Sequence, residues 1–445
     1  MKIFIFLLLT LLALVGLSSC SAPAQPLPLL GDAAPLTFTA REYVLADVIT
    51  PRANEFALLA IAHDGFAVQL QGHELDGVRL RWRGGWELHA PEHPPSANVR
   101  DIAQLIVISQ SDDPYAVRLI DAEGDVRELT AGQLLTQHPQ RMLKLIGTSW
   151  IGDRSASVFH VEYRIALCEI LLSEGQHTVF TRSGHSEHLR STAGRYLLVT
   201  QNQIDMVFAA SRSNPDLGRQ DILGIITDAP TVQITQLFHD ALQFIEQGEQ
   251  VLAIKIDGLG WNMLAYAPFI SSLNPQRALA AWPPITPTGL ASMLTGAPPY
   301  VHGITSRGQR NLLVDDIFTL VPNSVHIGAR NSFINTSLPP QLTTSDADAF
   351  MLAQQSLAEP ADFTFVHFKQ VDSTAHYYGP HAEQTQQAIA EIDSFVRLLA
   401  EQFDGRIIIT SDHGLHDTED GGNHGLFLPQ DMLVPYVTFR FAATS

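Results

Sequence analysis

The chain has 445 residues, which is too long for one typical hydrophobic core, so at least two domains are expected. Hydrophobic residues make up 45% of the sequence, which fits a globular protein and excludes wholesale disorder. The formal net charge of −19 argues against a nucleic-acid partner, which favours a basic face. It does not exclude a small anionic substrate, because bound divalent metal ions can reverse the local field.

The N-terminus has the features of a secretory signal. A basic start precedes an apolar run from Ile3 to Val15, and small residues lead up to Cys20. Leu-Ser-Ser-Cys at 17–20 also resembles the lipobox of bacterial lipoproteins, which implies a lipidated Cys20, a membrane anchor and an extracytoplasmic location. The alternative is an uncleaved transmembrane anchor, for which the run is short. Cys168 is then expected to be a buried small hydrophobe rather than a nucleophile.

The predicted signal covers residues 1–20, and the Pro- and Ala-rich residues 21–35 are predicted to form an extended tether. Residues 36–230 are predicted to form a β-rich accessory domain of unknown role, because short apolar or alternating runs recur between turn signals. The runs are Phe56–Ile61, Phe66–Leu70, Val78–Trp82, Gln104–Ile108, Val117–Ile120, Thr178–Phe180 and Tyr196–Thr200. Some helix is also expected there, at Glu162–Leu172.

Residues 231–445 alternate between strand and helix patterns, which predicts an α/β domain with a mainly parallel sheet and helices on both faces. The predicted strands are Val251–Ile256, Val325–Ile327, Phe363–Phe368, Arg406–Thr410 and Val434–Phe441. Helical periodicity marks Val232–Gln247 and His381–Phe403.

Carboxylates and imidazoles follow several of these strands. Asp257 directly follows the first strand, Asp412 follows Arg406–Thr410, and Asp372 comes shortly after Phe363–Phe368. Residues at successive strand ends are expected to gather at one rim of the sheet. The full set is Asp257, Asp372, His376, Asp412, His413 and His424. This mixture of oxygen and nitrogen ligands suits a pair of divalent ions such as zinc, although each motif alone could be a turn or a helix cap.

The order of these motifs resembles the alkaline phosphatase superfamily, and most closely its type I phosphodiesterase/nucleotide pyrophosphatase branch. The motifs are Asp257, Thr286, Asp372-x-x-x-His376, Asp412-His413-Gly and Asn423-His424-Gly. The resemblance extends from about Val251 to Phe441. It implies an alkaline-phosphatase-like fold and a hydrolase of phosphoric esters with two metal ions, for which Zn²⁺ is expected. One ion would be held by Asp257, Thr286, Asp412 and His413, and the other by Asp372, His376 and His424.

The resemblance also makes Thr286 the nucleophile and a phospho-threonine the intermediate. A threonine hydroxyl is a weak nucleophile near neutral pH, and coordination to a metal is one of the few ways to activate it. A helix that begins at Thr286 would in addition favour phosphate oxygens. Thr288 is a rival two residues further on, and a simple N-cap role is the alternative for both threonines.

One position departs from the family pattern. After His302-Gly303-Ile304, phosphodiesterase relatives usually carry an asparagine that binds the phosphate, and here its place is taken by Arg307, with Arg310 nearby. A guanidinium can bind a dianionic phosphate with two hydrogen bonds, which would favour a monoester or another dianion. Alternatively, both arginines are exposed loop residues, and Asn311 or Asn331 has the role of the asparagine.

Three functions remain open. The first is hydrolysis of a small phosphorylated substrate by an envelope lipoprotein. The second is hydrolysis of a phosphonate or another ester within the superfamily; a sulfatase is excluded because the stretch 286–289, Thr-Pro-Thr-Gly, lacks the Cys/Ser-x-Pro-x-Arg motif. The third is a non-catalytic binding lipoprotein of the envelope, which would be expected to have lost at least one of the ligands.

Overall fold

The structure is a computed structural model that describes residues 24–137, 141–151, 154–171, 175–200, 203–208, 218–329, 333–358 and 361–441. Cys20, with the rest of the predicted signal, and Asn331 lie outside these residues. The chain forms two compact units. Unit 1 takes its described residues from Met1–Ala116, Leu129–Ala166 and Tyr196–Val207, and unit 2 takes its own from Val117–Glu128, Leu167–Arg195 and Phe208–Ser445.

Unit 1 consists mainly of antiparallel strands. A five-stranded sheet has the order β2-β1-β8-β4-β5, a three-stranded sheet has the order β3-β6-β7, and a four-stranded sheet has the order β11-β12-β15-β16. The strands are β1 Leu27–Gly31, β2 Thr37–Phe38, β3 Glu42–Val44, β4 Phe56–Ala62, β5 Ala67–Gln71, β6 Arg79–Trp82, β7 Trp86–His89, β8 Ile102–Ser109, β11 Arg141–Ile151, β12 Arg154–Ala166, β15 Arg195–Val199 and β16 Ile204–Phe208. The short helices are α2 Leu45–Val48 and α3 Ala131–Gln137. The predicted β-rich character is therefore confirmed.

Three local expectations for this part of the chain need correction. The helix predicted at Glu162–Leu172 is wrong, because β12 continues to Ala166 and only α4, Leu167–Ile170, is helical. Pairing of β12 with strands on both sides outweighs the local helical pattern. Cys168 is exposed rather than buried. Within the segment predicted as a tether, β1 pairs with β2 and β8.

Unit 2 contains a smaller five-stranded sheet of order β10-β9-β17-β13-β14. Its strands are β9 Val117–Ile120, β10 Val126–Leu129, β13 His177–Thr181, β14 Ser186–Leu189 and β17 Ile222–Thr227. Segments from before residue 231 thus contribute to the same compact unit as the C-terminal residues. The limits 36–230 and 231–445 stay predictions about independently folding domains.

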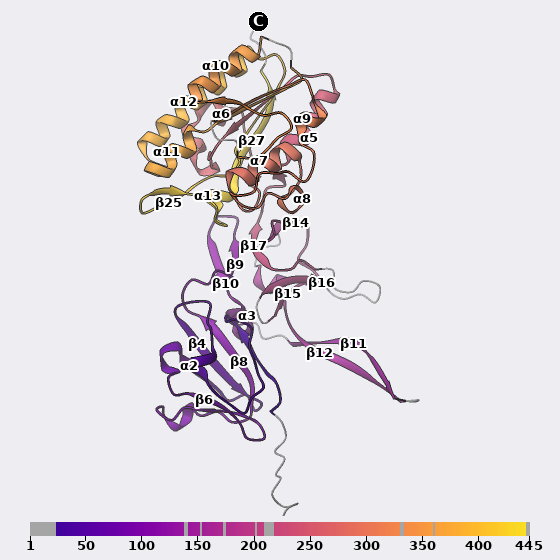
Figure 1. The fold of residues 1–445 in the computed structure, drawn as a ribbon, viewed down its shortest axis with the longest axis vertical. Helices are drawn as coiled ribbons and strands as arrows, with labels where there is room; N and C mark the ends of the chain where they lie inside the picture. The colour runs from indigo at the N-terminus through magenta and orange to yellow at the C-terminus, as the bar shows by residue number, and fades with distance from the viewer. Residues whose placement is uncertain are drawn as a thin grey trace, which may run out of the picture. The chain divides into compact units, whose positions relative to one another are not determined.

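An eight-stranded sheet forms the centre of unit 2, where Figure 1 labels its strand β27. The strand order is β18-β20-β27-β24-β19-β23-β21-β22. Its strands are β18 Val232–Gln233, β19 Val251–Ile256, β20 Gln276–Leu279, β21 Ser324–Ala329, β22 Gln341–Thr343, β23 Phe363–Phe368, β24 Arg406–Thr410 and β27 Leu433–Arg440. Only β27 runs antiparallel to its neighbours among the described strands. The predicted mainly parallel sheet is confirmed.

Helices cover both faces of this sheet, as its continuously apolar strands require. Leu252 and Ile254 pack in a core with α10, α11 and α12, and Ala253 packs on the other face with α5 and α7. The helices are α5 Gln236–Glu246, α6 Pro268–Ser272, α7 Thr286–Thr295, α8 Pro299–His302, α9 Ile317–Leu320, α10 Asp346–Ser356, α11 Gln370–Tyr378, α12 Glu383–Gln402 and α13 Pro429–Met432, with the 3₁₀ helix η3 Trp261–Tyr266. The first helix starts later than predicted, because Val232–Gln233 pairs as β18.

Across the described ranges, no helix combines the length and the apolar character that a bilayer crossing requires.

Candidate active site

Three aspartates meet at the carboxyl edge of the central strands. Asp257 directly follows β19, Asp412 comes two residues after β24, and Asp372 lies in the first turn of α11, which follows β23. Since β24, β19 and β23 are adjacent and parallel, their ends share one edge. The backbone joins two of these sites directly, because Asp372 N–H donates to the carbonyl of Asp257 at 3.1 Å. All three aspartates are buried.

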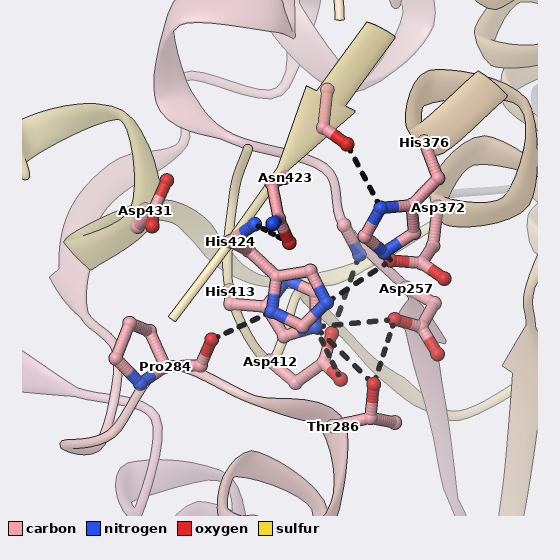
Figure 2. Close-up of polar contacts among 12 residues, drawn as sticks. Asp257, Pro284, Thr286, Asp372, His376, Asp412, His413, Asn423, His424 and Asp431 are labelled. Carbon is pink, nitrogen blue, oxygen red and sulfur yellow. Dashed lines mark hydrogen bonds and ion pairs between the residues drawn. The ribbon is translucent and has the colours of Figure 1, made fainter. Parts of the chain in front are cut away.

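Helix α7 brings Thr286 to the same edge. The helix begins at Thr286, and the Thr286 hydroxyl lies 3.5 Å from Asp257 Oδ1 and 3.3 Å from His413 Nε2 (Figure 2). The close approach depends on Gly289, where an added Cβ would lie 2.5 Å from Asp412 Cβ. The rival Thr288 is buried as well, but its hydroxyl has no hydrogen-bond partner.

The three histidines present the same nitrogen to the aspartates. The Nδ1 atoms of His376, His413 and His424 lie 2.9, 3.1 and 2.8 Å from the carbonyl oxygens of Gly422, Gly414 and Pro284. A carbonyl oxygen can only accept a hydrogen bond, so each Nδ1 carries a hydrogen. In the neutral imidazole the lone pair is then on Nε2, which faces the carboxylates and is the form that binds metal ions.

Four distances within the first group of predicted ligands match those of a tetrahedral metal site. His413 Nε2 lies 3.5 Å from Asp257 Oδ1 and 3.5 Å from Asp412 Oδ2, and the Thr286 hydroxyl lies 3.3 and 3.5 Å from the first two of these atoms. Ligands bonded to zinc at about 2.0–2.1 Å are roughly 3.3–3.4 Å apart. A group of ligand atoms within 4.8 Å of one another is formed by Asp257, His413 and Asp372, so a divalent ion at His413 has Asp372 within reach as well.

The second group consists of Asp372, His376 and His424, whose ligand atoms lie within 4.8 Å of one another. Asp372 Oδ1 is 3.3 Å from His376 Nε2 and 3.6 Å from His424 Nε2, yet this buried oxygen makes no hydrogen bond. The rings of His413 and His424 stack with centroids 3.6 Å apart, so the two groups are adjacent (Figure 2). An unpaired buried carboxylate oxygen beside two imidazole nitrogens fits a second cation.

Burial and neighbouring charges set the protonation states of these ligands. Burial and the charge of His413 lower the pKa of His424 to about 2, so His424 stays neutral and can act as a ligand. Contact with the Asp372 carboxylate, 3.3 Å away, raises the pKa of His376 despite its partial burial. In the absence of a metal ion, a proton on His376 Nε2 thus partly takes the position that a cation would occupy.

Two buried residues that sequence reasoning missed lie behind Asp257 and Asp412. Lys255 Nζ is 3.1 Å from Asp257 Oδ2 and 2.8 Å from Asp412 Oδ2, and His367 Nε2 is 2.8 Å from Asp257 Oδ2. The signal for both was a single ionisable residue inside a fully buried strand, in VLAIKI and FTFVHF.

This contact determines the charge state of the aspartates. Burial alone would raise the pKa of Asp257, but Lys255 and the hydrogen bond from His367 bring it well below its usual range. Burial and repulsion by Asp257 raise the pKa of Asp412. Burial alone would lower the pKa of Lys255, but the charges of both aspartates outweigh it and the pKa is raised.

Arg307 and Arg310, at the position where the family usually has an asparagine, are both exposed. One of them contacts a predicted metal ligand. Arg307 Nη2 lies 3.2 Å from His424 Nε2. Arg310 is joined to Asn335 through its backbone carbonyl, and the side chain of Asn311 accepts from Asn335 at 2.8 Å. Arg307 is thus the arginine whose guanidinium contacts the histidines, while a substrate role for either arginine stays a prediction.

The fold of unit 2 and the residues of its site can be compared with those of known protein families. Unit 2 is an α/β unit with carboxylates and histidines around a hydroxyl at the carboxyl edge of its sheet. Residues 251–323 and 314–434 match the family model described as type I phosphodiesterase / nucleotide pyrophosphatase. This match supports the alkaline phosphatase superfamily and phosphoric ester hydrolysis as the chemistry of this part of the chain. A comparison with curated proteins gave no match.

The solved structures that are similar to the chain include two of one murine protein and one of a sulfatase. Murine ectonucleotide pyrophosphatase/phosphodiesterase 5 is 17% identical, with 38% of this chain and 58% of that chain covered and a TM-score of 0.34. An inactive variant of it in complex with AMP is 16% identical, with the same coverage and TM-score. The 2-O GAG sulfatase BT1596 is 12% identical, with 43% of this chain and 64% of that chain covered and a TM-score of 0.37. The chain therefore spans less than two thirds of each of them.

Proposed function

We propose that this protein is a metal-dependent hydrolase of phosphoric esters that acts through a phosphorylated Thr286. The observation that carries the proposal is the orientation of the three histidines. Each donates its Nδ1 hydrogen to a backbone carbonyl and turns Nε2 towards carboxylate oxygens at 3.3–3.6 Å, and His413 Nε2 also lies 3.3 Å from the Thr286 hydroxyl. The family match of residues 251–434 supports the same chemistry.

The donor set divides into two positions. Asp257, Thr286, Asp412 and His413 would hold one ion, and Asp372, His376 and His424 would hold the other, with zinc as the proposed metal. When bound, two such ions lower the pKa of a coordinated hydroxyl and stabilise the charge on the departing oxygen. The chain itself supplies the position of the hydroxyl, since Thr286 is fixed at the first turn of α7, where backbone N–H groups favour phosphate oxygens.

The reaction takes two displacements at phosphorus. In the first, Thr286 Oγ1 bonds to phosphorus while the bond to the ester oxygen breaks, and that oxygen leaves as an alcohol after taking up a proton. In the second, the oxygen of a water molecule bonds to phosphorus and the bond to Thr286 Oγ1 breaks, which releases phosphate or a phosphate monoester and restores the hydroxyl. Holding the reacting groups in place accounts for most of what the protein contributes.

We further propose that Arg307 makes a phosphate monoester or another dianion the preferred substrate. Its guanidinium lies 3.2 Å from His424 Nε2, and once that nitrogen is used as a ligand the guanidinium is free to bind phosphate oxygens. The proposal further includes a lipid on Cys20 and a membrane-tethered, extracytoplasmic enzyme. That part is supported by the sequence motif at 17–20 alone.

The test uses the metal-loaded protein with aryl phosphate mono- and diesters, quenched in acid during turnover and analysed by mass spectrometry. We expect a phosphoryl group on Thr286, and a fall in turnover on the order of 10³-fold or more in Thr286→Ala. Thr288→Ala is the matched control, because its hydroxyl is buried in the same helix without a partner, and it should still become labelled at Thr286.

Two outcomes would contradict the proposal. Labelling of Thr288 instead of Thr286 would make the rival threonine the nucleophile. Inactivity towards every phosphoryl substrate, with two ions bound per chain, would favour the binding lipoprotein.

A further inference from the structure

A buried ammonium group lies behind the first metal position. Lys255 belongs to β19, and its side chain is 0% exposed. Its Nζ lies 3.1 Å from Asp257 Oδ2, 2.8 Å from Asp412 Oδ2 and 2.9 Å from His367 Nε2. Moving a lysine charge into a protein interior costs free energy unless the charge is paired. The buried Lys255 therefore requires its contact with the two carboxylates.

The two aspartates use their oxygens in different ways. Asp257 turns Oδ2 towards Lys255 and His367, while its Oδ1 faces Thr286 and His413. Asp412 accepts from the backbone N–H of Gly258 through Oδ1 and faces both Lys255 and His413 with Oδ2. Asp257 therefore presents to the site the oxygen that Lys255 does not contact, whereas Asp412 presents the same oxygen to Lys255 and to the site.

From this arrangement we infer that Lys255 is a positioning residue, which acts as a built-in counter-cation for Asp257 and Asp412 and keeps both carboxylates in place before a metal ion arrives. His367 Nε2 lies 2.8 Å from Asp257 Oδ2 and 2.9 Å from Lys255 Nζ, so it contacts both members of this ion pair. This inference rests on the proposed two-metal site, but it concerns the metal-free protein. It means that Asp257 and Asp412 take their places in the first metal position before any metal ion binds.

The physical consequence is a difference between the metal-free and metal-loaded states. Without Lys255, two carboxylates would share a fully buried site with no lysine charge between them, and a bound metal ion or the uptake of a proton would be needed to relieve their repulsion. A lysine that merely filled space in the core would, when replaced, lower the stability of both states by the same amount. The comparison of the two states therefore separates these roles.

The experiment measures thermal unfolding of the full chain, stripped of metal by chelation and then reloaded with zinc. For Lys255→Met we expect the melting temperature of the metal-free protein to fall by about 10 °C, as for a buried ion pair that has lost one partner. The metal-loaded variant should fall by less than half as much, so that the zinc-induced rise in melting temperature exceeds that of the wild type. Ile254→Ala, a core truncation in the same strand, is the matched control and should lower both states equally.

A second variant covers the case in which Lys255→Met does not fold without metal. Lys255→Gln keeps a hydrogen-bond donor but removes the charge, and it should show the same enlarged effect of zinc. Wild-type protein that binds fewer than two ions by elemental analysis would overturn the proposed two-metal function. A wild type that binds two ions, together with Lys255 variants whose response to zinc equals that of Ile254→Ala, would overturn the role of Lys255 alone.

Discussion

At the scale of single residues, some members of the site could be predicted from the sequence and others could not. Asp257, Asp412 and His413 could be predicted, because strand ends in a parallel sheet share an edge. Lys255 and His367 could not be given a role, because in a buried strand the direction and reach of one polar side chain depend on which strands become its neighbours. The order β24-β19-β23 determines that Lys255 meets Asp412 and His367.

Arg307 allows a test of substrate choice at the same scale. Since its guanidinium lies beside His424, we expect Arg307→Ala to lower kcat/KM for an aryl phosphate monoester by about 10- to 100-fold, and to affect the matching diester less, because a diester offers one charged oxygen fewer. Arg310→Ala, in the same exposed loop, is the matched control and should have the smaller effect. Equal losses on both substrates would show that Arg307 does not read the second phosphate charge.

At the scale of elements, close backbone approaches hold the helix of the nucleophile against the sheet. An added Cβ at Gly289 would meet Asp412 at 2.5 Å for its Cβ and 2.9 Å for its carbonyl oxygen, and an added Cβ at Gly258 would meet the backbone of Asp372 at 3.0 Å. Gly258 also has a φ of +77°, which side chains rarely adopt. Both glycines are thus required by the site rather than by the helix or the turn alone.

Gly289→Ala tests this contact between elements. Alanine is the better helix former, so a loss could not come from helix propensity. We expect the methyl group to push α7 away from Asp412 and to lower kcat by about 100-fold, as a displacement of about 1 Å does in other active sites. Gly308→Ala, where the added Cβ meets no atom within 4 Å, is the control for the substitution itself. Unchanged kcat in Gly289→Ala would mean that the helix can yield without moving Thr286.

The elements also show where local patterns were sufficient. β19, β23 and β24 have the predicted bounds, since a continuous apolar run between turns leaves little choice. The predicted helix at Glu162–Leu172 failed because the edge of β15 was available to extend β12, and a ladder partner distant in sequence is not visible in a local pattern. Thr286 begins its helix as expected, but the closeness of that helix to Asp412 follows from packing.

At the scale of the whole molecule, two buried histidines outside the ligand set predict acid lability. Burial lowers the pKa of His302 to about 4 and that of His326 to about 4, from an ordinary value of 6.5. A group with a depressed folded-state pKa takes up its proton more readily when unfolded, so its stabilising effect is complete above pH 6.5 and is lost as the pH falls towards 4. Each histidine contributes up to about 3 kcal/mol to this loss.

Chemical denaturation of the metal-free protein at several pH values between 7 and 4 measures this effect. We expect the free energy of unfolding to fall across that interval, and to fall less steeply in His302→Gln, whose side chain can still reach the Ser292 hydroxyl that His302 Nε2 contacts at 3.0 Å. A slope that the substitution leaves unchanged would assign the acid sensitivity to other groups.

The small sheet of unit 2 bears directly on how this protein could be shortened or recombined. Phe427, three residues after His424, is completely buried and packs against Phe180 of β13, with ring centroids 5.3 Å apart. An added Cβ on Gly224 of β17 would touch the same phenylalanine at 2.3 Å. A gene fragment that starts at Val232 would encode every predicted ligand but leave Phe427 without this cover. When segments are exchanged between related proteins, the loop of His424 is therefore expected to keep its structure only if β13 and β17 are transferred with it.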